Sequence, residues 1–257
     1  MDDVDAPSSE DPADPEDGAV GRSRRRPADV VAAVRGIEPG LAIVLLLTLS
    51  TGAVDAVSFF SLDHVFTANM SGNIALLGVG AATSFGDVVG NVFAFAGFVV
   101  GSVLVARFLR PRRGPALRVA RDALVLELAL LLVVAAVLAA VDVRADDAWR
   151  YGVCFVLAAA MGVQTGVART LAVADVNTTV ATMTLHDLAA ASRVAGGDST
   201  RWGRRATVVA ALFVGAAIGV ALDGVVRWGG LAFTCLLVLV VVMATSAVVV
   251  EREAATV

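Results

Sequence analysis

Long apolar stretches constrain this chain more than any other feature of its sequence. Each is about 17 to 25 residues long, the length that a helix needs to cross about 30 Å of hydrocarbon. The six stretches are Leu41 to Phe60, Val88 to Leu109, Ala123 to Val141, Trp149 to Val173, Ala206 to Leu222 and Leu231 to Val250. Because 58% of all residues are hydrophobic, far above the share in a soluble domain, the sequence predicts an all-α integral membrane protein in a lipid bilayer.

Two weaker stretches, Val65 to Ser84 and Val176 to Ala191, leave two topologies open. If both cross the bilayer, there are eight short spans and the arginines divide twelve to eight between its two sides. If both enter and leave on the same side, seventeen of the twenty arginines share one side. The positive-inside rule favours the second topology. We therefore predict six transmembrane helices and two re-entrant, or broken, helices, with both termini in the cytoplasm.

The first 36 residues differ in composition from the rest. Eight acidic residues lie between positions 2 and 17, and "RSRRR" follows at 22 to 26. Such a segment cannot bury apolar surface and is predicted to be a disordered cytoplasmic tail, whose arginines anchor the topology. Its acidic start argues against a cleavable signal peptide. The predicted organisation is a tail at 1–36, membrane repeats at 37–141 and 142–251, and a short C-terminal tail at 252–257.

The two repeats are related by similar short motifs. "TGAVDAVSFF" (51–60) resembles "MGVQTGVART" (161–170), "TANMSGN" (67–73) falls near "TTVATMT" (178–184), and "FAGFVVG" (95–101) matches "FVGAAIG" (213–219). With three spans in each half, the second copy runs through the membrane inverted relative to the first. Interrupted helices at corresponding positions of inverted repeats mark the central site of a transporter.

Small polar residues fit such an interruption, since non-helical backbone at membrane depth must be satisfied by protein or water. We expect Ser71 and Asn73 to cap a half-helix, and Gly72 to permit a tight or left-handed turn. The positive end of that half-helix favours an anionic or polar ligand. The predicted substrate-binding residues are Asp55, Asn69, Ser71, Gly72, Asn73, Gln164, Thr165, Thr182 and Thr184.

Asp55 is also the candidate for proton coupling. A carboxylate near the bilayer centre costs about 2.5–3.5 kcal/mol on insertion scales, so it needs a partner, a proton or water. The alternative is a structural carboxylate paired with a neighbouring helix. Hydroxyl and amide side chains such as Ser71 and Thr184 also have an alternative role, which is to join helices by hydrogen bonds.

The stretches "GAVDAVSFFSLDHVFTANMSGNIALLG" and "GVQTGVARTLAVADVNTTVATMTLHDL" resemble the two signature stretches of the YoaK-like family of bacterial membrane proteins, domain of unknown function 1275. The resemblance covers about residues 40–250 and implies a six-span inner-membrane protein of unassigned function. The family pattern has Thr, Asn and Gly where this chain has Ser71, Thr165 and Met183.

The leading functional hypothesis is a secondary transporter or permease for a small polar or anionic solute, with Asp55 as the candidate group for coupling to a proton. A membrane scaffold or regulatory subunit is the second hypothesis and an intramembrane enzyme the third. The sequence has no lysine and no H-E-x-x-H or G-x-S-x-G motif, so no enzyme is expected. No metal, cofactor or nucleic acid is expected. The G-x-x-x-G runs at 97–101, 162–166 and 215–219 predict internal close packing, with a homodimer seam as the alternative.

Overall fold

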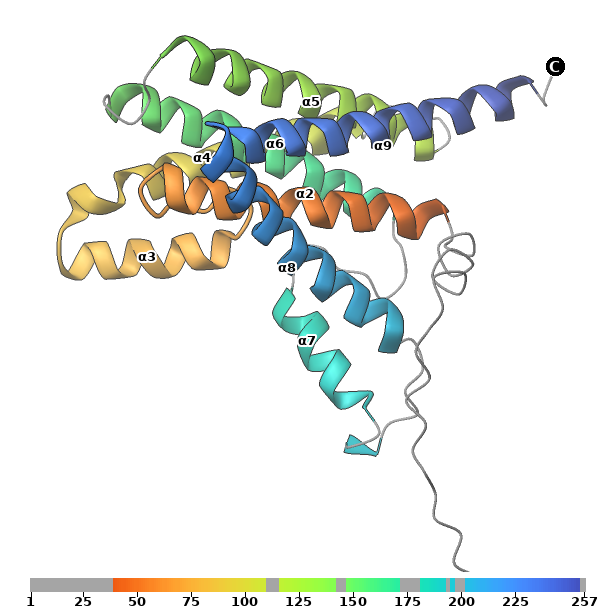
Figure 1. Cartoon of the computed structure of the whole chain (residues 1–257), viewed down its shortest axis with the longest axis horizontal. Coiled ribbons are helices and arrows are strands. Elements are labelled where there is room, and N and C mark those ends of the chain that lie inside the picture. The colour runs from red at the N-terminus through yellow and green to blue at the C-terminus, as the bar shows by residue number, and fades with distance from the viewer. Residues whose placement is uncertain are drawn as a thin grey trace, which may run out of the picture. The chain divides into compact units, whose positions relative to one another are not determined.

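The computed structural model describes residues 39–109, 116–141, 147–171, 181–192, 195–196 and 202–254. In this part of the chain it contains eight α-helices and one short 3-10 helix (Figure 1). They are α2 (Pro39–Ser61), α3 (Met70–Ala82), the 3-10 helix η1 (Phe85–Val88), α4 (Val89–Leu109), α5 (Ala116–Ala140), α6 (Asp147–Leu171), α7 (Ala181–Ala190), α8 (Trp202–Val225) and α9 (Gly229–Ala254).

Six of these helices are long and apolar enough to cross a bilayer, and they coincide with the six predicted stretches. The other two are too short. At 1.5 Å per residue, the 13 residues of α3 and the 10 residues of α7 reach about 20 Å and about 15 Å. The prediction of an all-α membrane protein with six spans is confirmed for the described residues, and helix lengths do not support the alternative of eight spans.

The helix ends differ from the predicted limits where charged residues begin. Helix α5 starts at Ala116, before the apolar stretch that begins at Ala123, and includes Arg118, Arg121 and Asp122. Helix α9 continues past Val250 to Ala254. An apolar stretch shows which part of a helix lies in hydrocarbon, whereas hydrogen bonding continues the helix into the polar region beyond it.

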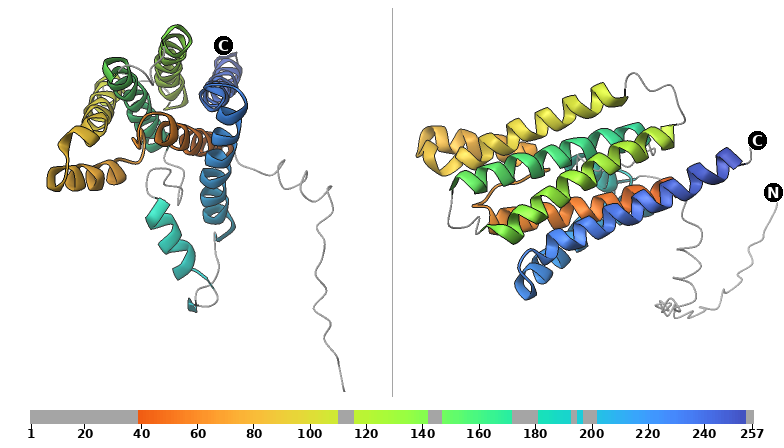
Figure 2. Two further views of the ribbon diagram at one scale, coloured as in Figure 1. Left: turned by 60° about the vertical axis from the view of Figure 1, so that its left-hand side comes forward. Right: turned by 90° about the horizontal axis from the view of Figure 1, so that it is seen from above.

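Two helix pairs pack closely, α4 with α6 and α2 with α8 (Figure 2). Glycines lie at both crossings. A Cβ atom added at Gly97 or Gly101 of α4 would overlap the backbone of Phe155 or Ala159 on α6. These contacts advance in the same direction along both helices, so α4 and α6 run parallel.

The second pair uses the same arrangement. A Cβ atom at Gly215 or Gly219 of α8 would overlap the backbone of Leu49 or Ala53 on α2, and these helices also run parallel. Small residues let helix backbones approach closely in membranes, where van der Waals contact takes the place of a hydrophobic driving force. Internal packing of G-x-x-x-G runs is therefore confirmed for α4 and α8.

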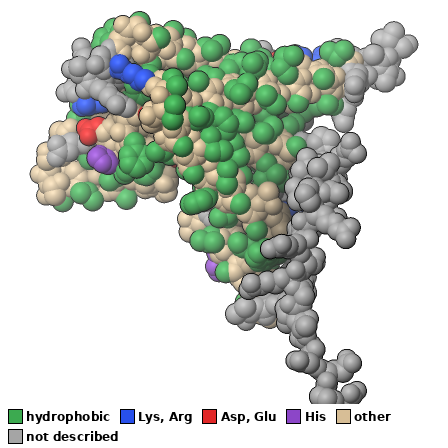
Figure 3. All heavy atoms as spheres, in the orientation of Figure 1, with side chains coloured by type: hydrophobic (Ala, Val, Ile, Leu, Met, Phe, Trp, Pro, Cys, Tyr) green, Lys and Arg blue, Asp and Glu red, His purple; other side chains and the backbone are tan. Residues whose placement is uncertain are grey.

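Hydrophobic side chains cover much of the described surface on the face seen in Figure 3. Large hydrophobic side chains such as Phe213 on α8 and Met243 on α9 are 74% and 64% exposed. In a membrane protein such surface contacts lipid, since apolar side chains have no preference there for the protein interior. The buried core lies between α2, α5, α6 and α9, with Leu47, Leu131, Met161 and Val238 among its members.

The glycine crossings predict a position-specific effect on stability. Replacing Gly215 with Ala should destabilise the fold by about 1–3 kcal/mol, because the new methyl group must push α2 and α8 apart. Gly224 lies on the same helix with nothing near its Cβ position, so Gly224→Ala is the matched control. We expect a lower melting temperature in detergent for Gly215→Ala only. Equal melting temperatures for the two variants would contradict this packing.

Candidate functional site

The chain reverses direction directly after α2. Asp63 and His64 both have positive φ, 63° and 60°, which is uncommon for residues other than glycine. The left-handed turn expected at Gly72 is therefore found earlier, at these two residues. Gly72 lies in the first turn of α3, and a Cβ atom there would come within 2.9 Å of the Phe66 ring. The absence of a side chain at Gly72 leaves room for the Phe66 ring. The role in turning that was predicted for Gly72 is therefore wrong.

Asp55 holds the returning segment against α2. Its Oδ1 atom accepts hydrogen bonds from the backbone N–H groups of Thr67 at 2.8 Å and Ala68 at 2.7 Å. Asp55 lies about six residues before the end of α2, or about 9 Å back along the helix. The segment before α3 therefore returns to a depth well inside the first span.

Asn73 of α3 bonds to the same segment at Phe66. Its completely buried carboxamide accepts from the Phe66 N–H at 3.0 Å and donates to the Phe66 carbonyl at 2.6 Å. Asn91 of α4 donates to the Asn73 Oδ1 at 3.1 Å. The backbone of Phe66 is thus paired by one side chain, as non-helical backbone in a membrane requires.

The residue that caps α3 is Asn69. Ser71 and Asn73 do not cap it. The Asn69 Oδ1 accepts from the Gly72 N–H at 3.3 Å and from the Ser71 hydroxyl at 2.8 Å. The capping role predicted for Ser71 and Asn73 is therefore wrong. The helix begins at Met70, which places Asn69 at the capping position and makes Ser71 a donor to the cap.

Gln164 of α6 reaches the same helix as Asp55. Its Nε2 donates to the Leu47 carbonyl at 3.0 Å and to the Thr51 hydroxyl at 2.7 Å, and its Oε1 accepts from Ser50 at 3.1 Å. These partners lie within about two turns of Asp55 on α2. Thr165 instead donates to the Met161 carbonyl of its own helix at 2.9 Å. Gln164 therefore joins α6 to α2, whereas Thr165 makes no such link through its hydroxyl.

The remaining predicted residues lie apart from this group. Thr184 is buried and Thr182 exposed on α7, which among the described helices contacts only α8. The start of the second re-entrant segment, 176–180, lies outside the described residues. The structure thus brings together Asp55, Asn69, Gly72 and Asn73, with exposed Ser71 at the cap. Gln164 of α6 bonds to α2 nearby, whereas Thr182 and Thr184 are not joined to this group.

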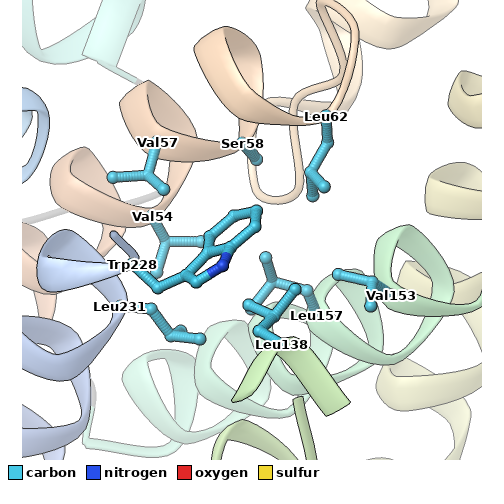
Figure 4. A pocket seen from close by; sticks show the side chains of 9 residues that line it. All are labelled: Val54, Val57, Ser58, Leu62, Leu138, Val153, Leu157, Trp228 and Leu231. Carbon is cyan, nitrogen blue, oxygen red and sulfur yellow. The ribbon is translucent and has the colours of Figure 1, made fainter. Parts of the chain in front are cut away.

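A small cavity lies beside this group, between α2, α5, α6 and α9 (Figure 4). Its volume is about 10 Å³, close to the least that holds one water molecule. Trp228 stands in the view between Val54 of α2 and Leu157 of α6, and Ser58 adds a hydroxyl. The other lining residues are Val57, Leu62, Leu138, Val153 and Leu231. The cavity is mostly apolar and is too small for a solute.

One buried acid was missed by the sequence reasoning. Glu127 of α5 has no exposed surface, and neither of its carboxyl oxygens has a hydrogen-bond partner among the described residues. It stands in a stripe of buried apolar residues with alternating spacings of three and four: Ala120, Leu124, Leu131, Val134 and Leu138. A lone acid inside the apolar stretch from Ala123 to Val141 was visible in the sequence, and such acids are functional candidates by default.

Comparison with known proteins finds one family over most of the chain. The model of the family described as "Protein of unknown function (DUF1275)" matches residues 43–245. The chain is 36% identical over 152 residues to the UPF0700 transmembrane protein YoaK of Bacillus subtilis (strain 168). That alignment covers 57% of this chain and 64% of the relative, slightly less than two thirds of its length. No solved structure matches the chain.

The anchoring of the segment by Asp55 predicts different effects for two substitutions. Asp55→Ala leaves the N–H groups of Thr67 and Ala68 without their acceptor, at a cost of about 1–3 kcal/mol for each buried group. Asp55→Asn keeps an amide oxygen at that position and should cost less. We expect melting temperatures to fall in the order wild type, Asn, Ala. A stable Ala variant would show that the segment is held by other contacts.

Proposed function

The chain belongs to the DUF1275 family of multi-pass membrane proteins, and we propose that it is a secondary transporter or permease for a small polar or anionic solute. The observation that carries this proposal is the interruption between α2 and α3. Non-helical backbone returns to the depth of Asp55, and the short helix α3 begins there. A half-helix that starts inside the membrane presents the positive end of its dipole to that depth, as in transporters with broken helices.

The Asp55 carboxylate binds two backbone N–H groups that an anionic solute could bind in its place. The carboxylate accepts from the N–H groups of Thr67 and Ala68, directly before the capped first turn of α3. Consecutive N–H groups at a helix start bind anions. In the proposed mechanism a solute anion competes with Asp55 for these two donors, and protonation of Asp55 weakens its hold on them. Solute binding and release of the segment from α2 are thereby linked.

The two glycine crossings support an arrangement of two inverted repeats. Gly97 on α4 and Gly215 on α8 occupy matching positions in the repeated motif, and each packs against the backbone of a parallel helix from the other half. In the proposed transporter these close pairs stay together. The α5 and α9 helices, which contact each other, are the elements free to shift between states.

A scaffold or regulatory subunit is the second candidate, and one observation favours it. The described polar groups around Asp55, Asn73 and Gln164 bond to one another and to backbone, and the neighbouring cavity has no room for a solute. The transporter proposal therefore requires a second conformation with a wider site. We propose no enzymatic reaction, because this group contains no paired nucleophile and base.

Solute uptake tests the transporter proposal. Purified protein in proteoliposomes should take up a member of a panel of small polar and anionic solutes. Asp55→Asn should reduce that uptake at least several-fold while the fold persists, since it removes the charge and keeps an acceptor. Asp63→Asn is the matched control, because asparagine tolerates the left-handed conformation at that position.

Two results would decide between the candidates. Loss of uptake in Asp55→Asn with normal uptake in Asp63→Asn supports transport through the Asp55 site. The absence of flux for the whole panel, with unchanged melting behaviour of Asp55→Asn, favours the scaffold.

We further propose a bacterial inner-membrane location with both termini in the cytoplasm, which follows from the arginine distribution. Reporter fusions after Arg113 and after Gly203 should both give a cytoplasmic signal. An extracellular signal after Arg113 would contradict the orientation, because that position follows an even number of spans in the six-span topology.

A further inference from the structure

Glu127 is a buried carboxyl group that the proposed solute site does not use. It lies near the middle of α5, whose 25 residues run from Ala116 to Ala140. Its side chain has no exposed surface, and both oxygens lack a hydrogen-bond partner among the described residues. It occupies a position in the core stripe where its neighbours one turn away, Leu124 and Leu131, are also completely buried.

Three helices pack against α5, and they bring few titratable groups to Glu127. Helices α6 and α9 make most of the contact, and α4 makes less. The titratable residues with described side chains on these helices are Arg107 on α4, Arg150, Tyr151, Cys154 and Arg169 on α6, and Cys235 on α9. Cys154 is part of the buried core that includes Leu124 and Leu131, and Cys235 packs against that core. Among the described residues no cation pairs with Glu127.

This environment decides the charge of the group. A buried carboxylate without a cation or hydrogen-bond donors loses its hydration and gains nothing in return. A protonated carboxyl group loses much less on burial, because it carries no net charge. The packed conformation therefore contains Glu127 in its neutral form. Asp55 differs, because two backbone N–H groups and the Thr67 hydroxyl offset part of the cost of its burial.

We propose that Glu127 is a proton-binding site in the membrane interior, loaded when α5 is packed against α6 and α9 and emptied when these helices part. A proton from water adds to one carboxylate oxygen, and the charge of the group changes from −1 to zero. The O–H bond breaks again when water or another acceptor reaches the group, and the proton leaves with it. No other reactant is needed. In the transporter this site couples proton movement to solute movement, a role that rests on the proposed function.

The position of Glu127 suits that coupling. It is on the face of α5 that packs against α6 and α9, both of which belong to the second half of the chain. A shift of α5 away from α6 and α9 changes the hydration of this group. Ionised Glu127 opposes the packed state and protonated Glu127 permits it, so the proton load biases the conformational equilibrium.

Labelling with a hydrophobic carbodiimide tests the protonated site without any solute. Dicyclohexylcarbodiimide enters lipid and adds to protonated carboxyl groups, and peptide mass spectrometry locates the adduct. In wild-type protein in liposomes we expect an adduct at Glu127 that decreases as pH rises. Asp55, whose carboxylate accepts two backbone hydrogen bonds, should label less than Glu127 at the same pH. Asp122→Asn on the same helix should label like wild type, because Asp122 pairs with Arg121 and is partly exposed.

Infrared spectroscopy supplies a second readout that does not depend on reagent access. The carbonyl band of a protonated carboxyl group should be present in wild type and in Asp122→Asn and lost in Glu127→Gln. The absence of both the adduct and the band in wild type would overturn the proposal.

Stability separates a proton site from a structural acid. Glu127→Leu should raise the melting temperature, because an unpartnered carboxyl group is replaced by a side chain that suits the core. A clear fall in melting temperature for both Glu127→Leu and Glu127→Gln would show that the carboxyl group has partners and would overturn the proposal.

Transport assays then test the coupling. Uptake by Glu127→Gln should lose its response to an imposed pH gradient, while Asp122→Asn keeps it. If wild type shows the adduct and the band but transports nothing, the proton site stands and the proposed function fails. If wild type transports solute and Glu127→Gln responds to pH as wild type does, the coupling role fails and the proposed function stands.

Discussion

The structure around the candidate site depends on one requirement, which is that backbone leaving a helix inside a membrane must find hydrogen-bond partners in the protein. The segment after α2 meets it through side chains. Asp55 pairs the N–H groups of Thr67 and Ala68, and Asn73 pairs both backbone groups of Phe66. Asn91 then ties Asn73 to α4. Polar residues gather in this part of an apolar chain because the interruption needs acceptors and donors at fixed places.

Much of the fold could be predicted from the sequence, because bilayer thickness fixes the length of an apolar span and arginine placement fixes which stretches cross. Asp55, Asn73 and Gln164 were also predicted to hold polar contacts, because of their polarity at membrane depth, and each does so in the structure. Their individual partners could not be predicted. Whether Asn69 or Ser71 caps α3 depends on the residue at which the helix starts, and a shift of one or two residues exchanges the roles. The turn at Asp63 and His64 has no glycine to indicate it.

Glu127 and Asp55 show why attention to motifs alone is insufficient. Asp55 stands within a repeated motif beside an interrupted helix, whereas Glu127 stands alone in a regular apolar helix. Spacing places Glu127 on the same face as Leu124 and Leu131, so periodicity could have predicted its burial, although the sequence analysis did not consider this residue. Its lack of hydrogen-bond partners could not be predicted from the sequence. The groups that face it come from α6 and α9, and packing decides which side of each of these helices faces α5.

The two acids differ in the hydrogen-bond donors that the described residues offer them. That difference fits the proposed transporter better than it fits a scaffold. A scaffold is stabilised by exchanging an unpartnered buried acid for leucine, and it gains nothing from keeping the acid. A protein that alternates between two packings gains from a group that is tolerated in one packing only when protonated. In the proposed transporter Asp55 determines where the interrupted segment lies, while Glu127 makes the packed state depend on proton supply. The first acid is held by backbone donors and the second is held by none that the described residues provide.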